Sequence, residues 1–201
     1  FFVGIEMTSV PSYVLVGFLK GRAKSSEASF KYVVYGAGAA GVMLYGISLL
    51  TGLLGTASIP EMATNLAVVL GNAQGIGDAT ARTVLLAILM VLVGLAFKLS
   101  IVPFHFWCPD AFEGASAEVA GFLSVASKGA AFGLLVRFCL AFVGSDSVPV
   151  PEVFTTLGLA MGAIAAVTVT FGNLAAYSQT NAKRLLAYST IAHAGFMLMA
   201  V

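Results

Sequence analysis

Long apolar stretches alternate with short polar connections along the whole chain. Each stretch is about 17–26 residues long, close to the roughly 20 residues that a helix needs to cross a bilayer. The strict apolar–polar alternation of a strand is absent, so the pattern predicts an all-α polytopic transmembrane helix bundle. We place its spans, within one transmembrane domain fragment, at residues 1–19, 32–54, 81–101, 118–143, 154–177 and 185–201.

Basic residues are concentrated in alternate connections. Lysine and arginine fall in 20–31 and 178–184, whereas 55–80 and 144–152 contain acidic residues without basic ones. By the positive-inside rule, the basic connections face the cytoplasm. The other two then lie on the outer side, where 59–70 is expected to form a short amphipathic helix on the membrane surface.

The connection 102–117 interrupts the apolar pattern in a different way, with proline, aromatic and acidic residues. Pro103 lacks an amide hydrogen and would clash with the carbonyl of Leu99 in a continuous helix. We therefore predict a broken helix, with freed carbonyls beside Lys98 that favour a cation. Broken helices recur at the binding sites of membrane transporters.

Composition supports a membrane protein. The chain is 59% hydrophobic and 9% charged, with a formal net charge of +1, whereas soluble domains carry about 25% charged residues. The small net charge and the lack of a basic run argue against a nucleic-acid partner. Because the chain opens on FFVGIEM and stops on FMLMAV, inside apolar stretches, we interpret it as an internal piece of a longer membrane protein.

Two lysines lie inside predicted spans. Lys128 is about 15 Å into its helix at 1.5 Å per residue, near the middle of a hydrocarbon core of about 30 Å. Its side chain is too short to reach either interface, so it is expected to face a hydrated interior or a partner. Lys98 lies nearer the end of its span, where spacing alone also allows it to reach the interface.

Glu6 and His193 are the other titratable candidates within the apolar stretches. A carboxylate at the depth of Glu6 must be neutral or paired, and we hypothesise that it pairs with Lys98. His193 lies about 12 Å into the last span, where an imidazole suits a proton relay. A histidine that only packs and hydrogen-bonds is the simpler interpretation of that one residue.

The remaining candidates suggest structural roles. His105 lies in the predicted break, where an interfacial or structural role is favoured over that of a ligand. Trp107 is expected to anchor the chain at the membrane interface. Asp110 and Glu113 are expected to cap the next helix or to bond backbone groups of the break.

The sequence contains no recognisable cofactor or metal site. Cys108 and Cys139 have no CxxC spacing, and two buried free thiols are the expected state. No glycine-rich phosphate loop, metal-ligand cluster or nucleophile elbow is present. The chemistry that remains is protonation and deprotonation of lysine, glutamate and histidine along a hydrated path, which is ion transport.

Three separated motifs carry a family resemblance. FKLSIVPFHFWCPDAFEGASAEVAGFLSVASKGAAF and NLAAYSQTNAKRLLAYSTIAHAGFMLMA resemble the hallmark segments of the antiporter-like membrane subunits of respiratory complex I, NADH:quinone oxidoreductase. EMTSVPSYVLVGFLKGRAKSSEASFKYVVYGAG looks most like subunit N, the chain 2 homologue, rather than its L and M relatives. One departure is ASAEV, where relatives often carry an APTPV-like run.

The resemblance implies half of an inverted-repeat antiporter-like fold and a proton-translocating function. By motif position, Glu6, Lys98 and Lys128 look like the family's glutamate and two lysines, and His193 lies on its hydrophilic axis. FMN, iron–sulfur clusters and quinone are then expected in partner subunits, with no redox centre in this chain. The implied partners are other membrane subunits of the complex, including another antiporter-like subunit, and the implied location is a bacterial inner membrane or another energy-transducing membrane.

Two other interpretations remain open. Subunits of multisubunit cation/proton antiporters and of membrane-bound hydrogenases share the lysine and broken-helix motifs. A non-conducting scaffold bundle is the second alternative, although a scaffold has no reason to retain charged residues inside the membrane, where each is costly.

Overall fold

The structure, a computed structural model, describes residues 1–72, 78–143 and 152–201. Helices dominate these residues. In chain order they are α1 (Phe2–Val16), α2 (Ala23–Leu54), α3 (Ile59–Asn72), α4 (Ala79–Leu99), α5 (Trp107–Gly114), α6 (Ala117–Phe122), a π-helical turn (Leu123–Ser127), α7 (Lys128–Val143), α8 (Glu152–Tyr177) and α9 (Ala182–Leu198). The predicted all-helical class is confirmed for the part of the chain described.

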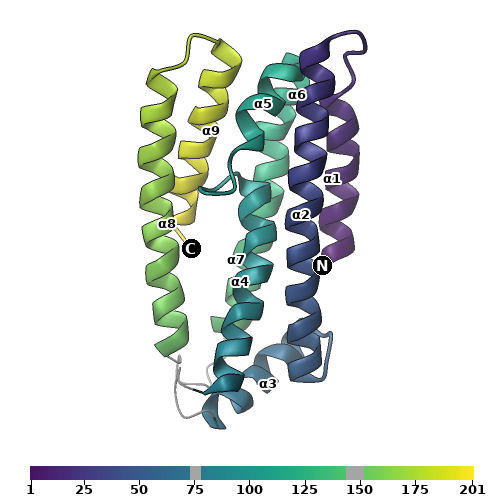
Figure 1. Ribbon diagram of the computed structural model, residues 1–201. Helices are drawn as coiled ribbons and strands as arrows, with labels where there is room; N and C mark the ends of the chain where they lie inside the picture. Colours follow the sequence, from purple (N-terminus) through teal and green to yellow (C-terminus); the bar gives the residue numbers. More distant parts are fainter. Residues whose placement is uncertain (73–77, 144–151) are drawn as a thin grey trace.

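The long helices run side by side, and α3 lies across one end of the bundle (Figure 1). Helix α2 packs on α1, α4 and α5, while α8 and α9 form a hairpin whose α9 packs on α5. The α2–α4 contact is close, because a Cβ added at Gly46 would lie 2.7 Å from Cβ of Met90. Small residues allow such close approach between membrane helices.

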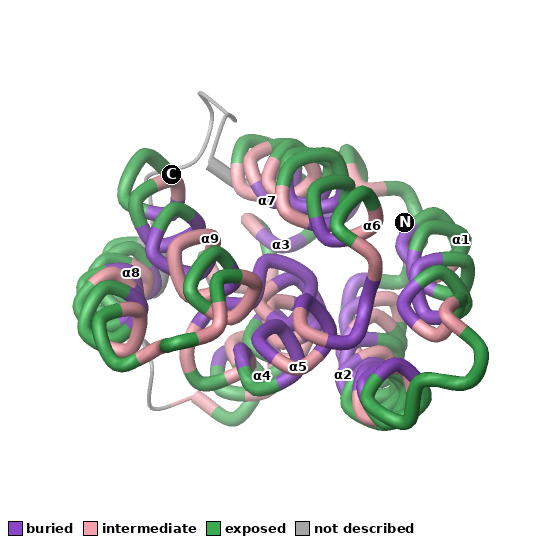
Figure 2. The backbone as a smooth tube through the Cα atoms, turned by 90° about the horizontal axis from the view of Figure 1, so that it is seen from above, coloured by how far each residue is buried: buried purple, intermediate pink, exposed green. Residues whose placement is uncertain are grey.

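The apolar surfaces match a bilayer environment. Four helical stretches are long and apolar enough to cross a membrane: Ala23–Leu54, Ala79–Leu99, Ala117–Leu140 and Thr155–Tyr177. The predicted spans 1–19 and 185–201 correspond to the shorter helices α1 and α9, of 15 and 17 residues. Buried residues face the centre of the bundle and exposed ones line its outside (Figure 2).

Several element boundaries differ from the predicted ones. Helix α2 begins at Ala23, so most of the basic segment 20–31 is helical, and its charged residues lie at a helix end. The connection 102–117 contains a further helix, α5. The expected short helix at 59–70 is present as α3. The predicted outer connection 144–152 lies, except for Glu152, outside the described residues.

The order of the elements sets one end of the bundle apart. The α1–α2, α5–α6 and α8–α9 connections all lie at the upper end in Figure 1, and the α2–α3 connection lies at the other. The basic segments 20–31 and 178–184 therefore share one end of the molecule, as the positive-inside rule predicts.

Candidate functional site

The predicted break is formed between α4 and α5. Helix α4 ends at Leu99, and Ser100 takes a left-handed conformation with φ of 59° and ψ of 39°. The helix thus stops four residues before Pro103, at the carbonyl with which a proline ring would clash. The backbone amide of Val102 then donates to Oγ1 of Thr168 on α8 at 3.2 Å, which ties the break to the neighbouring hairpin.

Trp107 holds the two halves of the broken helix together. Its side chain is 2% exposed, stacks on Tyr32 with ring centroids 4.2 Å apart, and donates from Nε1 to the carbonyl of Phe97 at 2.9 Å. That carbonyl belongs to the last turn of α4 and also accepts from the backbone amide of Ser100 at 3.0 Å. The expected role as an interface anchor was wrong, because the indole is used inside the protein to bind the end of α4.

Lys98 lies in the last turn of α4 and is 4% exposed. Its Nζ donates to Oγ of Ser9 on α1 at 3.0 Å, and that hydroxyl in turn donates to the carbonyl of Ile5 at 2.8 Å. The ammonium therefore extends toward α1, and its hydrogen bond is to a hydroxyl, not to the freed carbonyls that the sequence had suggested.

Glu6 precedes Ser9 by three residues, so the two share a side of α1. The Glu6 carboxylate is near enough to act electrostatically on the Lys98 ammonium. Among the described residues, however, Glu6 forms no ion pair within 4.0 Å. The hypothesised direct Glu6–Lys98 pair is therefore not formed in this structure, and Ser9 binds the lysine next to the carboxylate.

Lys128 is the most enclosed charged side chain described here, at 2% exposed. It is the first residue of α7, directly after the π-helical turn Leu123–Ser127. Such turns are rare and frequently mark functional sites. The Nζ of Lys128 donates to Oγ1 of Thr190 on α9 at 2.9 Å, so the lysine faces the protein interior as its position in the sequence predicts.

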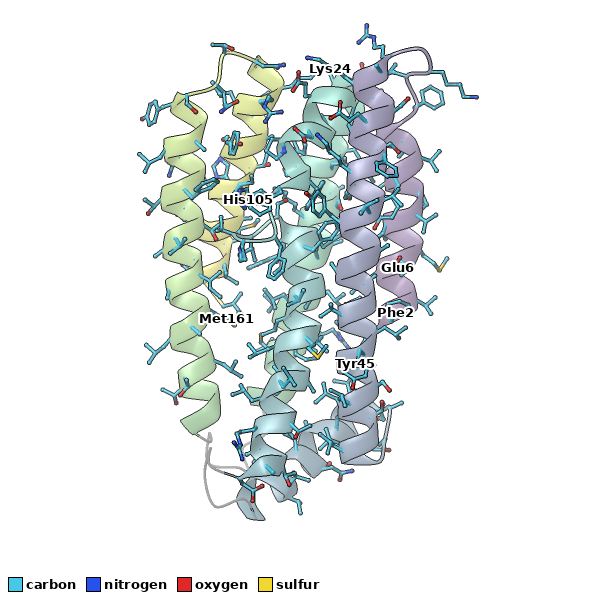
Figure 3. The ribbon with its side chains drawn as sticks, in the orientation of Figure 1. Phe2, Glu6, Lys24, Tyr45, His105 and Met161 are labelled. Carbon is cyan, nitrogen blue, oxygen red and sulfur yellow. The ribbon has the colours of Figure 1, made fainter. Side chains whose placement is uncertain are left out.

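The histidines occupy dissimilar environments. His193 is exposed on α9, with a ring contact to Phe196 at 6.4 Å, and the residue of α9 that meets Lys128 is Thr190 instead. His105 is 4% exposed in the break and packs against Phe171, with ring centroids 4.6 Å apart. Figure 3 shows His105 near mid-height of the bundle, inside the protein and away from either end.

A groove of about 650 Å³ runs between α1 and the α6–α7 helix. It is mainly apolar, but Lys98 and Ser127 both line it, together with Thr8 and Ser12 of α1. Ser127 is adjacent to Lys128 in sequence. The groove therefore extends from one lysine to the segment that carries the other. Its volume is large enough for several water molecules, since water occupies about 30 Å³ per molecule in the liquid.

A charged cluster closes the end of the bundle where the basic connections lie. Asp110 accepts from Lys31 at 2.9 Å and from Arg184 at 2.6 Å, and Glu113 accepts from Lys24 at 2.6 Å and from Arg184 at 3.0 Å. Asp110 and Glu113 therefore join α5 to α2 and α9 and do not cap the next helix. That cap comes from Ser116, which accepts from the amide of Val119 at 3.4 Å.

The cluster fixes the charge of its acids. The hydrogen bond from Lys24, followed by that from Arg184, holds the pKa of the Glu113 carboxyl below its usual range. Lys24 marks the cluster at the end of the bundle in Figure 3. Sequence reasoning missed these pairs, since the partners are 71 to 89 positions apart along the chain.

Cys108 and Cys139 are both free thiols, as expected, Cys108 fully buried and Cys139 partly so. Cys108 lies in the first turn of α5, and its Sγ is 3.8 Å from Oγ1 of Thr190. Within the described residues no group of three or more His, Cys, Asp or Glu side chains could hold a metal ion.

Comparison with known proteins matches the whole chain. Residues 1–201 fit the profile described as NADH:quinone oxidoreductase/Mrp antiporter, TM. NADH-quinone oxidoreductase subunit N of Anaeromyxobacter sp. (strain Fw109-5) is 46% identical over 98% of this chain and 39% of its own length. Subunit N 1 of Herpetosiphon aurantiacus is 43% identical over 100% of this chain and 39% of its own length. The chain thus spans about two fifths of the length of these curated relatives.

Solved structures share the fold. A chain of respiratory complex I from Thermus thermophilus aligns with a TM-score of 0.76 and 36% identity, over 99% of this chain and 39% of that one. A chain of the membrane-bound sulfane sulfur reductase, an archaeal respiratory membrane complex, gives 0.82 and 26%, over 99% of this chain and 37% of that one. A chain of the Mrp complex from Dietzia sp., at 22% identity, supports the fold alone, with a TM-score of 0.79.

A helix bundle with a broken helix, two buried lysines and these structural neighbours defines an antiporter-like membrane subunit. The chain belongs to the NADH:quinone oxidoreductase/Mrp antiporter family.

Proposed function

We propose that the chain is part of a proton-translocating membrane subunit of an NADH:quinone oxidoreductase, with Lys128 as the proton carrier. The observation that supports this most directly is the burial of Lys128 at 2% exposure, with a neutral hydroxyl as its hydrogen-bond partner. A lysine at the centre of a membrane helix costs about 2.5–3.5 kcal/mol on insertion scales. Lysine readily exchanges its proton when buried, whereas arginine does not.

Lys98 and Glu6 are proposed to gate this carrier. In the arrangement described, Ser9 binds the Lys98 ammonium at 3.0 Å, and Glu6 lies one turn away on the same side of α1. If the Lys98 ammonium moved from the Ser9 hydroxyl to the Glu6 carboxylate, the electric field at Lys128 would change. This field would act across the groove that α1 and the α6–α7 helix line. A signal from the quinone-reducing part of the complex would act on this pair.

The onward path is proposed to use water and His193. The groove beside Lys98 and Ser127 is large enough for several water molecules. His193 follows Thr190 by three residues on α9, which places it one turn from the hydroxyl that binds Lys128. Protons would pass from Lys128 toward this exposed imidazole and on to a part of the subunit that is not included in this chain.

The assembly follows from the curated relatives, which are named as subunits of NADH-quinone oxidoreductases. We propose that this chain works with other membrane subunits, including another antiporter-like one, in a bacterial inner membrane or another energy-transducing membrane. The redox reaction itself, with FMN, iron–sulfur clusters and quinone, is assigned to partner subunits.

The decisive experiment compares two substitutions of Lys128 in the full-length subunit within its complex, in sealed vesicles. Lys128→Ala removes the proton site, and Lys128→Arg keeps a charge whose proton is not released. Both should reduce proton uptake at least tenfold and, through coupling, slow quinone reduction. Lys20→Ala, an exposed lysine in the α1–α2 connection, is the matched control. Normal pumping by Lys128→Ala would exclude this function for Lys128.

A second candidate is a cation/proton antiporter or another respiratory membrane complex. The TM-score of 0.82 to a chain of the sulfane sulfur reductase complex favours keeping it. The two candidates differ in whether NADH is the electron donor and in which ion is transported. NADH-driven proton uptake that is unaffected by removal of sodium would support the first, and strict dependence on a sodium gradient would support the second.

A further inference from the structure

Three helices meet at the hydroxyl of Thr190. The Nζ of Lys128 on α7 donates to this oxygen at 2.9 Å, and the hydroxyl donates to the carbonyl of Ala187, in its own helix, at 2.8 Å. The Sγ of Cys108 on α5 lies 3.8 Å from the same oxygen and 3.9 Å from the same carbonyl. Helices α5 and α9 are neighbours in the view along the bundle (Figure 2).

The number of hydrogens in this group limits its arrangements. A hydroxyl has one hydrogen to donate, and an ammonium can only donate. While Lys128 is protonated, Thr190 must therefore accept from it, and its own hydrogen is directed to Ala187. Once Lys128 has released its proton, the neutral amine gains a lone pair that can accept. Thr190 can then donate to the amine, which withdraws its hydrogen from the Ala187 carbonyl.

The thiol of Cys108 already shares that carbonyl with the Thr190 hydroxyl. Its Sγ lies 3.9 Å from the Ala187 oxygen, within the range of a weak hydrogen bond from sulfur, and the residue is 0% exposed, so water does not compete. Once Thr190 has turned to the amine, the thiol no longer shares the carbonyl with the hydroxyl. Cys108 lies in the first turn of α5, the second half of the broken helix. Two further residues of that helix, Asp110 and Glu113, are ion-paired to α2 and α9.

We propose that Thr190 is a positioning residue for the proton on Lys128, and that Thr190 and Cys108 form a two-state hydrogen-bond switch that joins this proton to α5. The inference rests on the proposed function, because it takes Lys128 as the carrier. The proton balance is simple. Lys128 releases one proton, and Thr190 and Cys108 keep their hydrogens: Thr190 changes its acceptor, and the Cys108 thiol no longer shares the Ala187 carbonyl with it. The charge state of Lys128 is thereby transmitted to the broken helix through the side chain of Cys108.

The first test compares Thr190→Val with Thr190→Ser in the assembled complex, in sealed vesicles. Valine keeps the volume and removes the hydroxyl, while serine keeps the hydroxyl. Thr190→Val should pump about tenfold more slowly or worse, the lower limit expected for losing a hydrogen bond to a charged group. Thr190→Ser should pump within about twofold of the unsubstituted protein. Normal pumping by Thr190→Val, or equal loss in both variants, would overturn the role of the hydroxyl.

The second test reads the thiol directly, by the infrared S–H stretching band, and does not depend on pumping. Cys108→Ala identifies the band and separates it from that of Cys139. Lys128→Met should shift the Cys108 band, because the Thr190 hydroxyl, which shares the Ala187 carbonyl with the thiol, loses the ammonium that donates to it and strengthens its own hydrogen bond. Ser189→Ala, on the same helix without a contact to Cys108, should leave the band in place. An unshifted band in Lys128→Met would refute the switch.

The two tests separate this inference from the function on which it rests. If Lys128→Met pumps normally, Lys128 is not the carrier and the proposed function fails. If Lys128→Met stops pumping while the Cys108 band stays unchanged and Thr190→Val pumps normally, the carrier stands and only the switch fails.

Discussion

At the scale of single residues, Ser9 is the least expected member of the site. A serine in an apolar helix usually satisfies itself by donating to a carbonyl one turn back, and Ser9 does so at Ile5. Its remaining lone pairs are what allow it to bind Lys98 at 3.0 Å as well. The Ser9 hydroxyl therefore holds the Lys98 ammonium beside Glu6, and, because a hydroxyl carries no charge, it leaves the positive charge of Lys98 unneutralised.

Ser9→Ala tests this arrangement. The change leaves the Lys98 ammonium without its hydrogen-bond partner in a site that is 4% exposed. A hydrogen bond to a charged group contributes about 1.5–3 kcal/mol. We expect Lys98 to move to Glu6 and the coupling between proton uptake and quinone reduction to fall, measured as protons taken up per quinone reduced. Thr83→Ala is the matched control, since this hydroxyl on α4 donates to the carbonyl of Ala79 in its own helix and does not line the groove. An unchanged ratio in Ser9→Ala would show that Ser9 has no part in gating.

The charged candidates were predictable and their partners were not, for a physical reason. Lys128 stands out in the sequence because an ammonium in the middle of an apolar span is costly. Thr190 and Ser9 do not stand out, because a hydroxyl in a membrane helix can bond to its own backbone and needs no further explanation. Trp107 was misjudged for a similar reason. Its partner, the carbonyl of Phe97, comes within reach of the indole N–H only once α4 has ended at Leu99 and the chain has turned back to Trp107.

At the scale of elements, α5 is the critical piece. It has only eight residues, and the charged cluster fixes its far end. An isolated helix of this length is marginal, so its stability must come from tertiary contacts. Arg184 bonds both Asp110 and Glu113 and so attaches α5 to α9.

Acidification should loosen this attachment. The pKa of Glu113 is held below its usual range by Lys24 and Arg184. A carboxyl with a lowered folded-state pKa contributes full stability above its unfolded-state pKa and loses it as the pH falls through the folded-state value. Glu113→Gln should therefore destabilise the subunit by about 0.5–1 kcal/mol at neutral pH, the upper range for exposed pairs, and by progressively less on acidification.

Thermal unfolding of the purified complex, at pH 7 and at a series of pH values below the ordinary glutamate pKa of about 4.3, measures this difference. Glu27→Gln is the matched control, because Glu27 pairs only with Lys31 and its side chain is 61% exposed. A destabilisation by Glu113→Gln that stays constant over the acidic range would contradict the charge-based explanation and leave a packing effect instead.

The elements themselves were largely predictable, and their ends were not. Apolar length alone predicted helices where α1, α2, α4, α7, α8 and α9 lie, and Pro103 predicted the break. The start of α2 was placed nine residues too late, at Tyr32 instead of Ala23, because a run of charged and hydroxyl residues resembles a loop. In the structure Lys24 and Lys31 form ion pairs with α5, and those tertiary contacts favour a helix where local polarity does not.

At the scale of the whole molecule, the orientation in the membrane follows from the end at which the charges gather. The α1–α2 and α8–α9 connections, with their basic residues, lie at the same end as the charged cluster (Figure 1). That end is expected to face the cytoplasm. Proton entry to Lys128 from that side would then pass close to α5, whose first turn contacts Thr190 through Cys108.

Labelling with a membrane-impermeant maleimide tests this orientation. In a Cys139→Ala background, with Cys108 retained because it is fully buried, single cysteines are placed at exposed positions in the full-length subunit. Ser26→Cys and Ser178→Cys, at the basic end, should react in inside-out vesicles and be protected in intact cells. Ser58→Cys, in the α2–α3 connection, should behave in the opposite way. Reaction of Ser58→Cys and Ser178→Cys from the same side would contradict the arrangement, because α4, the α6–α7 helix and α8 would then not all cross the bilayer.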